Sequence, residues 1–247
     1  MMNWRCRQLS RMLIAGALLA ISPGGSAGAA EPLKIAVVGG NGMIGQRIVR
    51  EALDRGHHVT VIVRDPSGVD ARHERLQVRQ GDVLDSAQIS RLIAGQAVVV
   101  SAVGSARAKT PDRGLYRKAA ESLVGVLRGL EEKAPRLIVV GGVGSLTHPA
   151  SGQLMLDRAT PDRQPEHLGQ KAALDYYRTV RDVSWTYVSP PASILPGQRT
   201  GVYRLGDDTL IVNDKRESHI TMEDFAVAIV DEAENPRHVG RRFTVAY

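Results

Sequence analysis

Short apolar runs alternate along the chain with longer segments in which apolar residues recur at helical spacing. The first run, Leu33 to Val38, is continuous and rich in β-branched residues, which is typical of a strand buried on both faces. The segment from Met43 to Arg55 carries its apolar residues on one helical face, and Gly56 follows it where a helix C-terminus favours glycine. This order predicts a βαβ unit at the start of a parallel sheet.

The alternation continues to residue 189 and predicts most of the fold. We expect strands at 33–38, 58–63, 76–80, 97–103, 136–140 and 185–189, and helices at 43–55, 86–93, 115–133 and 166–180. Beyond the prolines at 190, 191 and 196 we expect short strands near 202–205 and 210–212, a helix opened by a capping box of Thr221 and Asp224, and a last strand at 242–246. The prediction is one doubly wound α/β domain of the Rossmann type over residues 31–247, with a small C-terminal substrate lobe at about 190–220.

Residues 1–30 have a different character. They hold three arginines and no acidic residue, then an apolar run at 12–21, then a stretch of small residues. This is the layout of a secretory signal peptide, and its apolar run is too short for a bilayer, which requires about 20 apolar residues. We expect cleavage near Ala27–Ala29, an exported or periplasmic mature protein, and no membrane span within it. Without cleavage, the protein would be cytoplasmic or tethered by its N-terminus.

Removal of that segment changes the charge of the protein. Three of the 32 Lys and Arg residues leave and all 26 Asp and Glu residues stay, so the formal charge falls from +6 to +3. A small excess without a long basic run does not support a nucleic-acid partner. The one cysteine, Cys6, leaves as well, and the seven histidines show no i, i+4 pair. We therefore expect no disulfide, no metal site and a small-molecule substrate.

Candidate chemistry begins at Gly39-Gly40-Asn41-Gly42-Met43-Ile44-Gly45, between the first expected strand and the first expected helix. Glycine is needed where the backbone turns tightly, where it approaches a pyrophosphate, and where helix and strand pack closely. The helix N-terminus then offers N–H groups to the phosphates. The G-x-x-G-x-x-G pattern in this context predicts a dinucleotide site. Its cofactor-binding residues would be Gly39, Asn41, Gly42, Met43, Ile44 and Gly45.

The end of the second expected strand bears on which dinucleotide is bound. An acidic residue about 20 positions after the glycines holds the ribose 2′-hydroxyl of NAD, whereas an arginine there accommodates the 2′-phosphate of NADP. Here Arg64 comes first, 19 residues after Gly45, and Asp65 follows it. This favours NADP(H) over NAD(H). The alternative is a solvated Arg64 paired with Asp65 or Asp54.

Further cofactor contacts are expected where other strands end, because ligands of such sheets lie over the carboxyl ends of the strands. The residues after the third strand could flank the adenine, although Asp82 could equally form a turn or a helix cap. Small residues after the fourth strand would let the ribose approach, and residues 142–145 after the fifth lie near the expected place of the nicotinamide. The expected contacts are Asp82, Val83, Ala102, Val103 and Gly104.

Several motifs together resemble a known family. They are Gly-Gly-Asn-Gly-Met-Ile-Gly at 39–45, Val-Arg-Asp-Pro at 63–66, Gly-Asp-Val-Leu-Asp at 81–85, Val-Gly-Gly-Val-Gly-Ser-Leu at 140–146, Trp-Thr-Tyr-Val-Ser-Pro-Pro at 185–191 and Glu-Asp-Phe-Ala at 223–226. The chain resembles the atypical short-chain dehydrogenases/reductases that bind NAD(P)H, most of all the NADH-flavin reductases related to biliverdin-IXβ reductase. NmrA-like and isoflavone-reductase-like proteins are more distant. The resemblance covers 33–247 and implies the fold and the nucleotide site.

The catalytic residues depart from the short-chain dehydrogenase pattern, in which the proton donor is the tyrosine of Tyr-x-x-x-Lys. Here His167-Leu168-Gly169-Gln170-Lys171 stands where that motif would fall. The spacing of Lys171 before Ser189 resembles that of the lysine in isoflavone-reductase-like enzymes, which assists the ribose and proton transfer. The alternatives are a solvated lysine and an exposed loop histidine. The catalytic candidates are Lys171, His167 and Ser145, and Ser105 and Arg107 could line the pocket.

The absence of the tyrosine bears on the reaction. Hydride transfer from a nicotinamide to a flavin relies on stacking and exclusion of water, whereas carbonyl reduction requires a donor near the developing alkoxide. We therefore expect an NADP(H)-binding oxidoreductase that passes hydride to a flavin-like or quinone-like molecule. The rival is a non-catalytic NADP(H)-sensing or scaffold protein, as the NmrA-like resemblance implies. The small C-terminal lobe and the missing tyrosine disfavour a sugar-nucleotide epimerase.

Overall fold

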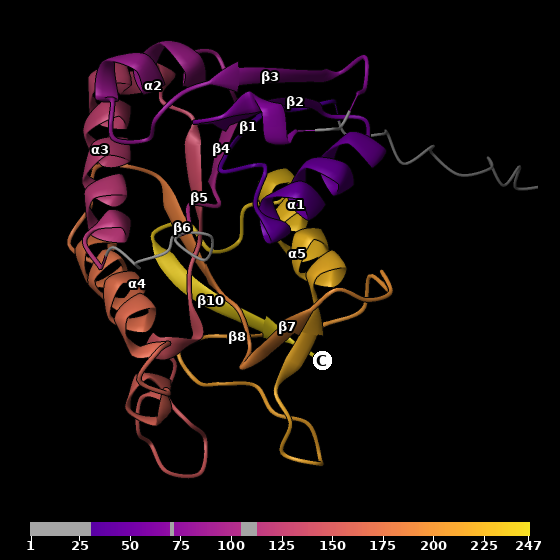
Figure 1. Ribbon diagram of the computed structural model, residues 1–247, viewed down its shortest axis with the longest axis vertical. Coiled ribbons are helices and arrows are strands. Elements are labelled where there is room, and N and C mark those ends of the chain that lie inside the picture. Colours follow the sequence, from indigo (N-terminus) through magenta and orange to yellow (C-terminus); the bar gives the residue numbers. More distant parts are fainter. Residues whose placement is uncertain (1–30, 70–71, 105–112) are drawn as a thin grey trace, which may run out of the picture. The chain divides into compact units, whose positions relative to one another are not determined.

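The central feature of the fold is an eight-stranded sheet in the order β3-β2-β1-β4-β5-β6-β10-β8 (Figure 1). The computed structural model describes residues 31–69, 72–104 and 113–247. All strand pairs from β3 to β10 are parallel, and only β8 joins the sheet antiparallel, on β10. The strands are β1 Lys34–Val38, β2 His58–Val63, β3 Leu76–Gln80, β4 Val98–Ser101, β5 Arg136–Val140, β6 Trp185–Ser189, β8 Arg204–Gly206 and β10 Arg241–Ala246.

Helices cover both faces of this sheet. Figure 1 shows α1 and α5 on one face, and α2, α3 and α4 on the other. The helices are α1 Met43–Asp54, α2 Ser86–Ile93, α3 Leu115–Leu130, α4 Gln164–Tyr177 and α5 Met222–Glu234. The order of the strands reverses between β1 and β4, which is the topological switch point of a doubly wound sheet. The predicted α/β Rossmann architecture is confirmed.

The strand sequences explain why both faces are covered. In β1, Ile35 and Val37 belong to the core cluster that contains Phe225 of α5, whereas Ala36 and Val38 belong to the cluster under α2, α3 and α4. Alternate residues of a strand face opposite sides, so a continuous apolar run must be buried on both. In the part of the chain that the structure describes, no helix is long and apolar enough to span a membrane.

The C-terminal part differs from the prediction in its short elements. Residues 210–212 do not form a strand; instead the N–H of Leu210 donates to the carbonyl of Thr147 at 2.9 Å, next to an isolated bridge. A parallel pair that was not expected, β7 Ser193–Leu195 and β9 His219–Thr221, forms a second small sheet. Elements of three residues carry too little periodicity to be separated from buried coil by sequence.

Two helices also have different boundaries. The helix expected at 166–180 is α4 at Gln164–Tyr177, and the helix expected at 115–133 ends at Leu130, with a 3₁₀ turn over Glu131–Lys133. Short 3₁₀ helices also occur at Pro66–Gly68, Val143–Ser145 and Met155–Arg158. Differences of this size at helix ends are expected, because the last turn of a helix often tightens.

The capping box predicted at the start of α5 is only half formed. The hydroxyl of Thr221 accepts the N–H of Asp224 at 3.1 Å, as predicted. The carboxylate of Asp224 does not return to Thr221; it accepts the N–H groups of Thr200 and Gly201 and the hydroxyls of Thr200 and Tyr247. Asp224 is fully buried. The sequence motif therefore marks the helix start, while the acid binds a distant segment.

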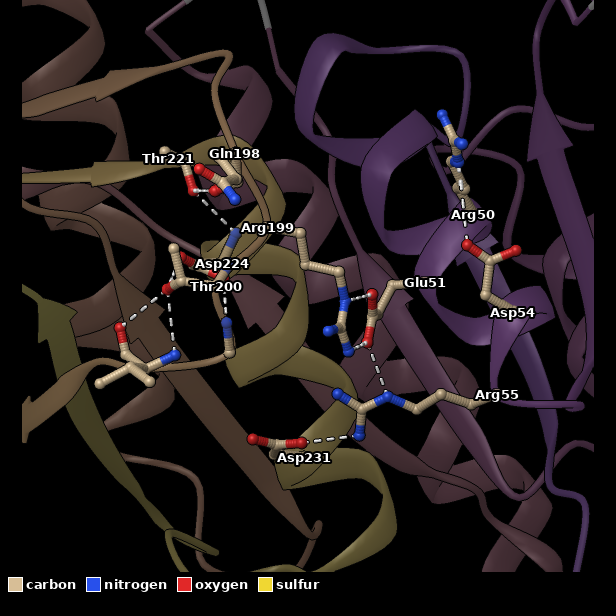
Figure 2. A network of polar contacts seen from close by, with 12 residues as sticks. Arg50, Glu51, Asp54, Arg55, Gln198, Arg199, Thr200, Thr221, Asp224 and Asp231 are labelled. Atoms are coloured by element: carbon tan, nitrogen blue, oxygen red, sulfur yellow. Dashed lines mark hydrogen bonds and ion pairs between the residues drawn. The ribbon is translucent and has the colours of Figure 1, made fainter.

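That segment, Gly197–Gly201, is tied to both helices of its face, and we call it the strap (Figure 2). The guanidinium of Arg199 donates twice to the carboxylate of Glu51 on α1, at 2.7 Å each. The N–H of Gly197 donates to Glu223 of α5 at 2.8 Å. The strap thus connects α1 with α5. Its Arg199 is 148 residues from Glu51 in sequence.

Candidate dinucleotide-binding site

The loop after β1 is shaped by the first glycine of the motif. Gly39 has a φ of +81°, and its N–H donates to the carbonyl of Ile62 in β2 at 2.9 Å. A Cβ at this position would lie 2.6 Å from the carbonyl oxygen of Ala102, which follows β4. Only glycine fits here, because both the backbone conformation and the neighbouring strand exclude a side chain.

The last glycine lets α1 pack on this loop. A Cβ at Gly45 would lie 2.3 Å from the carbonyl oxygen of Gly39 and 2.9 Å from the Cα of Gly40, and neither backbone atom can move freely. Gly40 in turn lies against Val61 of β2, where a Cβ would be 2.9 Å from a methyl carbon. The first turn of α1 is therefore seated directly on the loop, as the motif predicts.

The N-terminus of α1 is open on the side of Gly42. Gly42 is the N-cap residue, no side chain caps the described helix, and its first turn holds no acid. A Cβ at Gly42 would meet only the carbonyl oxygen of Gly39, at 3.3 Å. Met43 is exposed and Ile44 packs against the core, while the side-chain amide of Asn41 faces Gly68 beyond β2. This arrangement fits an anion, because uncapped N–H groups and the helix dipole favour negative charge.

Arg64 lies exposed at the end of β2. Asp65 accepts the N–H and the hydroxyl of Ser67, at 3.0 and 2.7 Å, and these hydrogen bonds lower the pKa of Asp65. Asp54 pairs with Arg50 instead. Neither acid of the alternative interpretation binds Arg64, and none of the ion pairs between described residues includes it. Its guanidinium is available to a ligand.

The residues after β3 form a turn. The carboxylate of Asp82 accepts the N–H of Leu84 at 3.0 Å, and the N–H of Asp82 donates to the side chain of Gln88. This agrees with the turn alternative, and the contact with adenine stays a prediction. Val83 is buried and its carbonyl accepts the hydroxyl of Ser122 at 2.6 Å.

After β4, Ala102 continues the ladder with an N–H that donates to Val38 at 2.8 Å. Val103 is half-buried and Gly104 is exposed. Ser105 and Arg107 lie outside the described residues. Of the residues predicted at this strand end, Ala102 lies against the glycine loop, because its carbonyl oxygen is close to Gly39.

Three glycines after β5 admit close neighbours. A Cβ at Gly141 would lie 1.9 Å from the ring of Tyr187, one at Gly142 would lie 1.7 Å from Oε1 of Gln170, and one at Gly144 would lie 2.6 Å from Cβ of His167. Helix α4 therefore sits directly on the carboxyl end of β5, and this brings His167 against Gly144. Gln170 lies against the same glycine run, and the sequence analysis did not select it. The signal for it was the glycine run, which indicates that something lies against it.

The catalytic candidates have different surroundings. His167 is half-buried with an Nδ1 that has no hydrogen-bond partner among the described residues, and burial lowers its pKa, so the imidazole is neutral at pH 7. The ammonium of Lys171 pairs with Asp175 at 2.7 Å. The hydroxyl of Ser145 is 3.2 Å from Nη1 of the buried Arg242. His167 and Lys171 share a face of α4, while Ser145 contacts β10.

Comparison with known proteins finds relatives that cover most of the chain. A family model described as NAD(P)H-binding matches residues 39–236. A solved structure from Burkholderia pseudomallei, "Putative exported protein", is 38% identical, with a TM-score of 0.75 over 87% of this chain and 100% of that one. The "putative NADH-flavin reductase" of Streptococcus pneumoniae is 33% identical, with a TM-score of 0.73 over 87% and 99%. The "putative epimerase" of Bacteroides thetaiotaomicron is 31% identical, with a TM-score of 0.76 over 88% and 98%.

The chain belongs to the NAD(P)H-binding family, since the family model spans most of it. The resemblance to the atypical short-chain dehydrogenases/reductases is confirmed. The fold is that of an NAD(P)H-binding oxidoreductase. The residues present suit the dinucleotide on structural grounds, because Gly39, Gly40 and Gly45 leave no room for side chains beneath an uncapped helix N-terminus.

Proposed function

We propose that the protein is an NADP(H)-dependent oxidoreductase that passes hydride to a flavin-like or quinone-like small molecule. The observation that carries the proposal is the glycine cradle under the open N-terminus of α1. Arg64 at the end of β2 adds the preference for a 2′-phosphate, since a guanidinium matches phosphate geometry. The name of the Streptococcus pneumoniae structure supports the flavin-like acceptor.

In this proposal the chain binds and orients, and the bound NADPH supplies the hydride. The N–H groups of the α1 N-terminus hold the pyrophosphate, and Arg64 holds the 2′-phosphate. His167 and Lys171, beside the end of β5, would contact the nicotinamide half. The hydroxyl of Ser145 accepts a hydrogen bond from Arg242, so Ser145 would hold the loop after β5 in place and would not contact the substrate.

The proton balance follows from the state of His167. The acceptor gains a hydride from the cofactor and a proton, and NADP⁺ is released. Because burial keeps His167 neutral at pH 7, its ring offers an N–H hydrogen bond, and the proton comes from water. A flavin or quinone that has accepted a hydride can take its proton from water, because its negative charge is delocalised over the ring system. This matches an acceptor of that class better than an isolated carbonyl.

Replacing Arg64 with leucine is expected to raise the Kd for NADPH about 10- to 100-fold and to leave the Kd for NADH unchanged. One or two charge-assisted hydrogen bonds to phosphate account for a loss of that size. Arg79→Leu is the control, since Arg79 is an exposed arginine on the neighbouring β3 whose side chain contacts Gln77. Calorimetric titration with both dinucleotides measures the effect. Equal losses for NADPH and NADH would show that Arg64 does not read the 2′-phosphate.

Turnover separates the enzyme from its rival. The purified protein is incubated with NADPH and with FMN, riboflavin, a soluble quinone or an aldehyde in turn, and nicotinamide absorbance is followed. We expect oxidation with a flavin or quinone and little with the aldehyde. NADPH binding without turnover of any of these acceptors would favour the NADP(H)-sensing or scaffold function instead.

We also propose that the protein is exported after removal of residues 1–30. The layout of that segment supports this, as does the name of the Burkholderia pseudomallei structure. Mass spectrometry of the mature protein from fractionated cells is expected to place its N-terminus close to residue 30, outside the cytosol. An intact Met1 on soluble cytosolic protein would contradict the proposal.

A further inference from the structure

The side chain of Gln170 occupies the space that a side chain of residue 142 would fill. From an ideal Cβ on Gly142, Oε1 of Gln170 would be 1.7 Å away, the amide carbon 2.5 Å and Nε2 3.2 Å. The amide of Gln170 is therefore a polar group at the carboxyl end of β5, although it is carried by α4. The sequence places no polar side chain of its own at residues 141–144.

The backbone of Gln170 is fixed from two sides. Its carbonyl accepts the hydroxyl of the buried Tyr187 at 3.0 Å. The adjacent Gly169 lies against the start of α3, where a Cβ would be 2.7 Å from the carbonyl oxygen of Arg113, just before the helix, and 2.9 Å from the ring of Tyr116 within it. The side chain thus starts from a rigid point, and its amide is pre-organised for a ligand.

The amide itself has no hydrogen-bond partner among the residues that the structure describes. Gln170 is half-buried, so its amide sits at the rim of the site. The position therefore has the features of a ligand contact.

We propose that the amide of Gln170 holds the carboxamide of the nicotinamide ring. This rests on the proposed function, since it requires a nicotinamide dinucleotide. With the pyrophosphate at the end of β1, the end of β5 lies two strands away across β4, about 10 Å, which the nicotinamide half spans. A carboxamide offers one N–H₂ donor and one carbonyl acceptor, so two such groups pair in both directions. Gln170 is a positioning residue that orients the ring beside His167.

The experiment compares ligands that do and do not contain the carboxamide. NADP⁺ carries it, adenosine 2′,5′-bisphosphate carries only the adenosine half, and the 3-acetylpyridine analogue of NADP⁺ has a methyl group in place of the amide NH₂. Calorimetry is carried out on the wild type, Gln170→Leu and Gln170→Glu. Gln170→Glu keeps the shape of the side chain and loses its N–H donor. Gln164→Leu is the matched control, an exposed glutamine at the first position of the same helix.

We expect Gln170→Leu and Gln170→Glu to weaken the binding of NADP⁺ about tenfold, which is the contribution of one or two hydrogen bonds. The affinity for the bisphosphate should be unchanged. The acetylpyridine analogue keeps the carbonyl acceptor and lacks the NH₂ donor, so Gln170→Leu should weaken its binding less than it weakens the binding of NADP⁺. Gln164→Leu should change nothing. Equal loss of NADP⁺ and bisphosphate, or no loss of either, overturns the inference and leaves the proposed function standing. A wild type that binds no NADP⁺ overturns the proposed function and, with it, the inference.

Discussion

Replacing Gly42 with aspartate is expected to weaken NADPH binding at least about a hundredfold while the protein stays folded. Gly42 is the N-cap of α1, with an ordinary extended backbone at φ −72° and ψ 165°. An aspartate there is a favourable cap, since its carboxylate accepts the free N–H groups of the helix. Those are the groups that the pyrophosphate would use, and the carboxylate also repels it. Binding and stability are therefore expected to move in different directions.

The matched control is Gly42→Asn, which has the same shape and also caps a helix but carries no charge. We expect it to lose less affinity than Gly42→Asp, and the difference between the two measures the electrostatic part. Both variants should unfold within about 1 kcal/mol of the wild type, because a Cβ at Gly42 meets only the carbonyl oxygen of Gly39 at 3.3 Å. Unchanged NADPH affinity in Gly42→Asp would place the phosphates elsewhere.

Asp224→Asn is expected to destabilise the fold by about 3 kcal/mol, which lowers Tm by about 6–12 °C. The buried carboxylate accepts two N–H and two O–H groups, from Thr200, Gly201 and Tyr247. An amide has one acceptor oxygen, and its NH₂ would face donors that it cannot satisfy. Thermal or urea unfolding measures the loss of stability. We expect the loss to arise because the strap is no longer held to α5.

Glu223→Gln is the control for this variant. Glu223 is the neighbouring acidic residue, and its side chain is partly exposed. Its carboxylate accepts the N–H of Gly197 and pairs with Arg47. We expect a loss of about 1 kcal/mol or less, because solvent can replace part of these contacts. A loss as large as that of Asp224→Asn would mean that burial of Asp224 is not what makes its contacts strong.

The same carboxylate gives stability a pH dependence. Burial alone would raise the pKa of Asp224, but the hydrogen bonds from Thr200, Tyr247 and Gly201 outweigh it and hold the pKa below its ordinary value of 3.8. The folded protein therefore binds the proton less readily than the unfolded chain. The contribution is fully present above pH 3.8 and is lost as the pH falls through the lowered pKa. Asp224→Asn should lack this part of the acid dependence.

The sheet and the glycine loop could be predicted because their signals are local. Continuous β-branched runs mark strands buried on both faces, and a glycine run between strand and helix marks a backbone that permits no side chains. The turn at Asp82 was also within reach, because an aspartate often bonds the N–H two residues on.

The remaining features depend on contacts between residues far apart in sequence. Asp224 looked like half of a local capping box, yet its carboxylate binds the strap 23 and 24 residues earlier. Ser145 looked like a free loop hydroxyl, yet Arg242 approaches it from 97 residues away. Gln170 carried no motif, and only the packing of α4 on Gly142 places its amide at the end of β5. No periodicity encodes such pairs.

Titration of the purified protein with NADPH, followed by nicotinamide fluorescence, tests the central claim most directly. The protein is expected to bind NADPH with a Kd of about a micromolar, more tightly than NADH, and to enhance the nicotinamide emission as the ring leaves water. Gly42→Asp, run beside it, should require at least about a hundredfold more NADPH for the same change in emission. A folded wild type that leaves the NADPH emission unchanged up to millimolar concentration would contradict a dinucleotide site at the glycine loop.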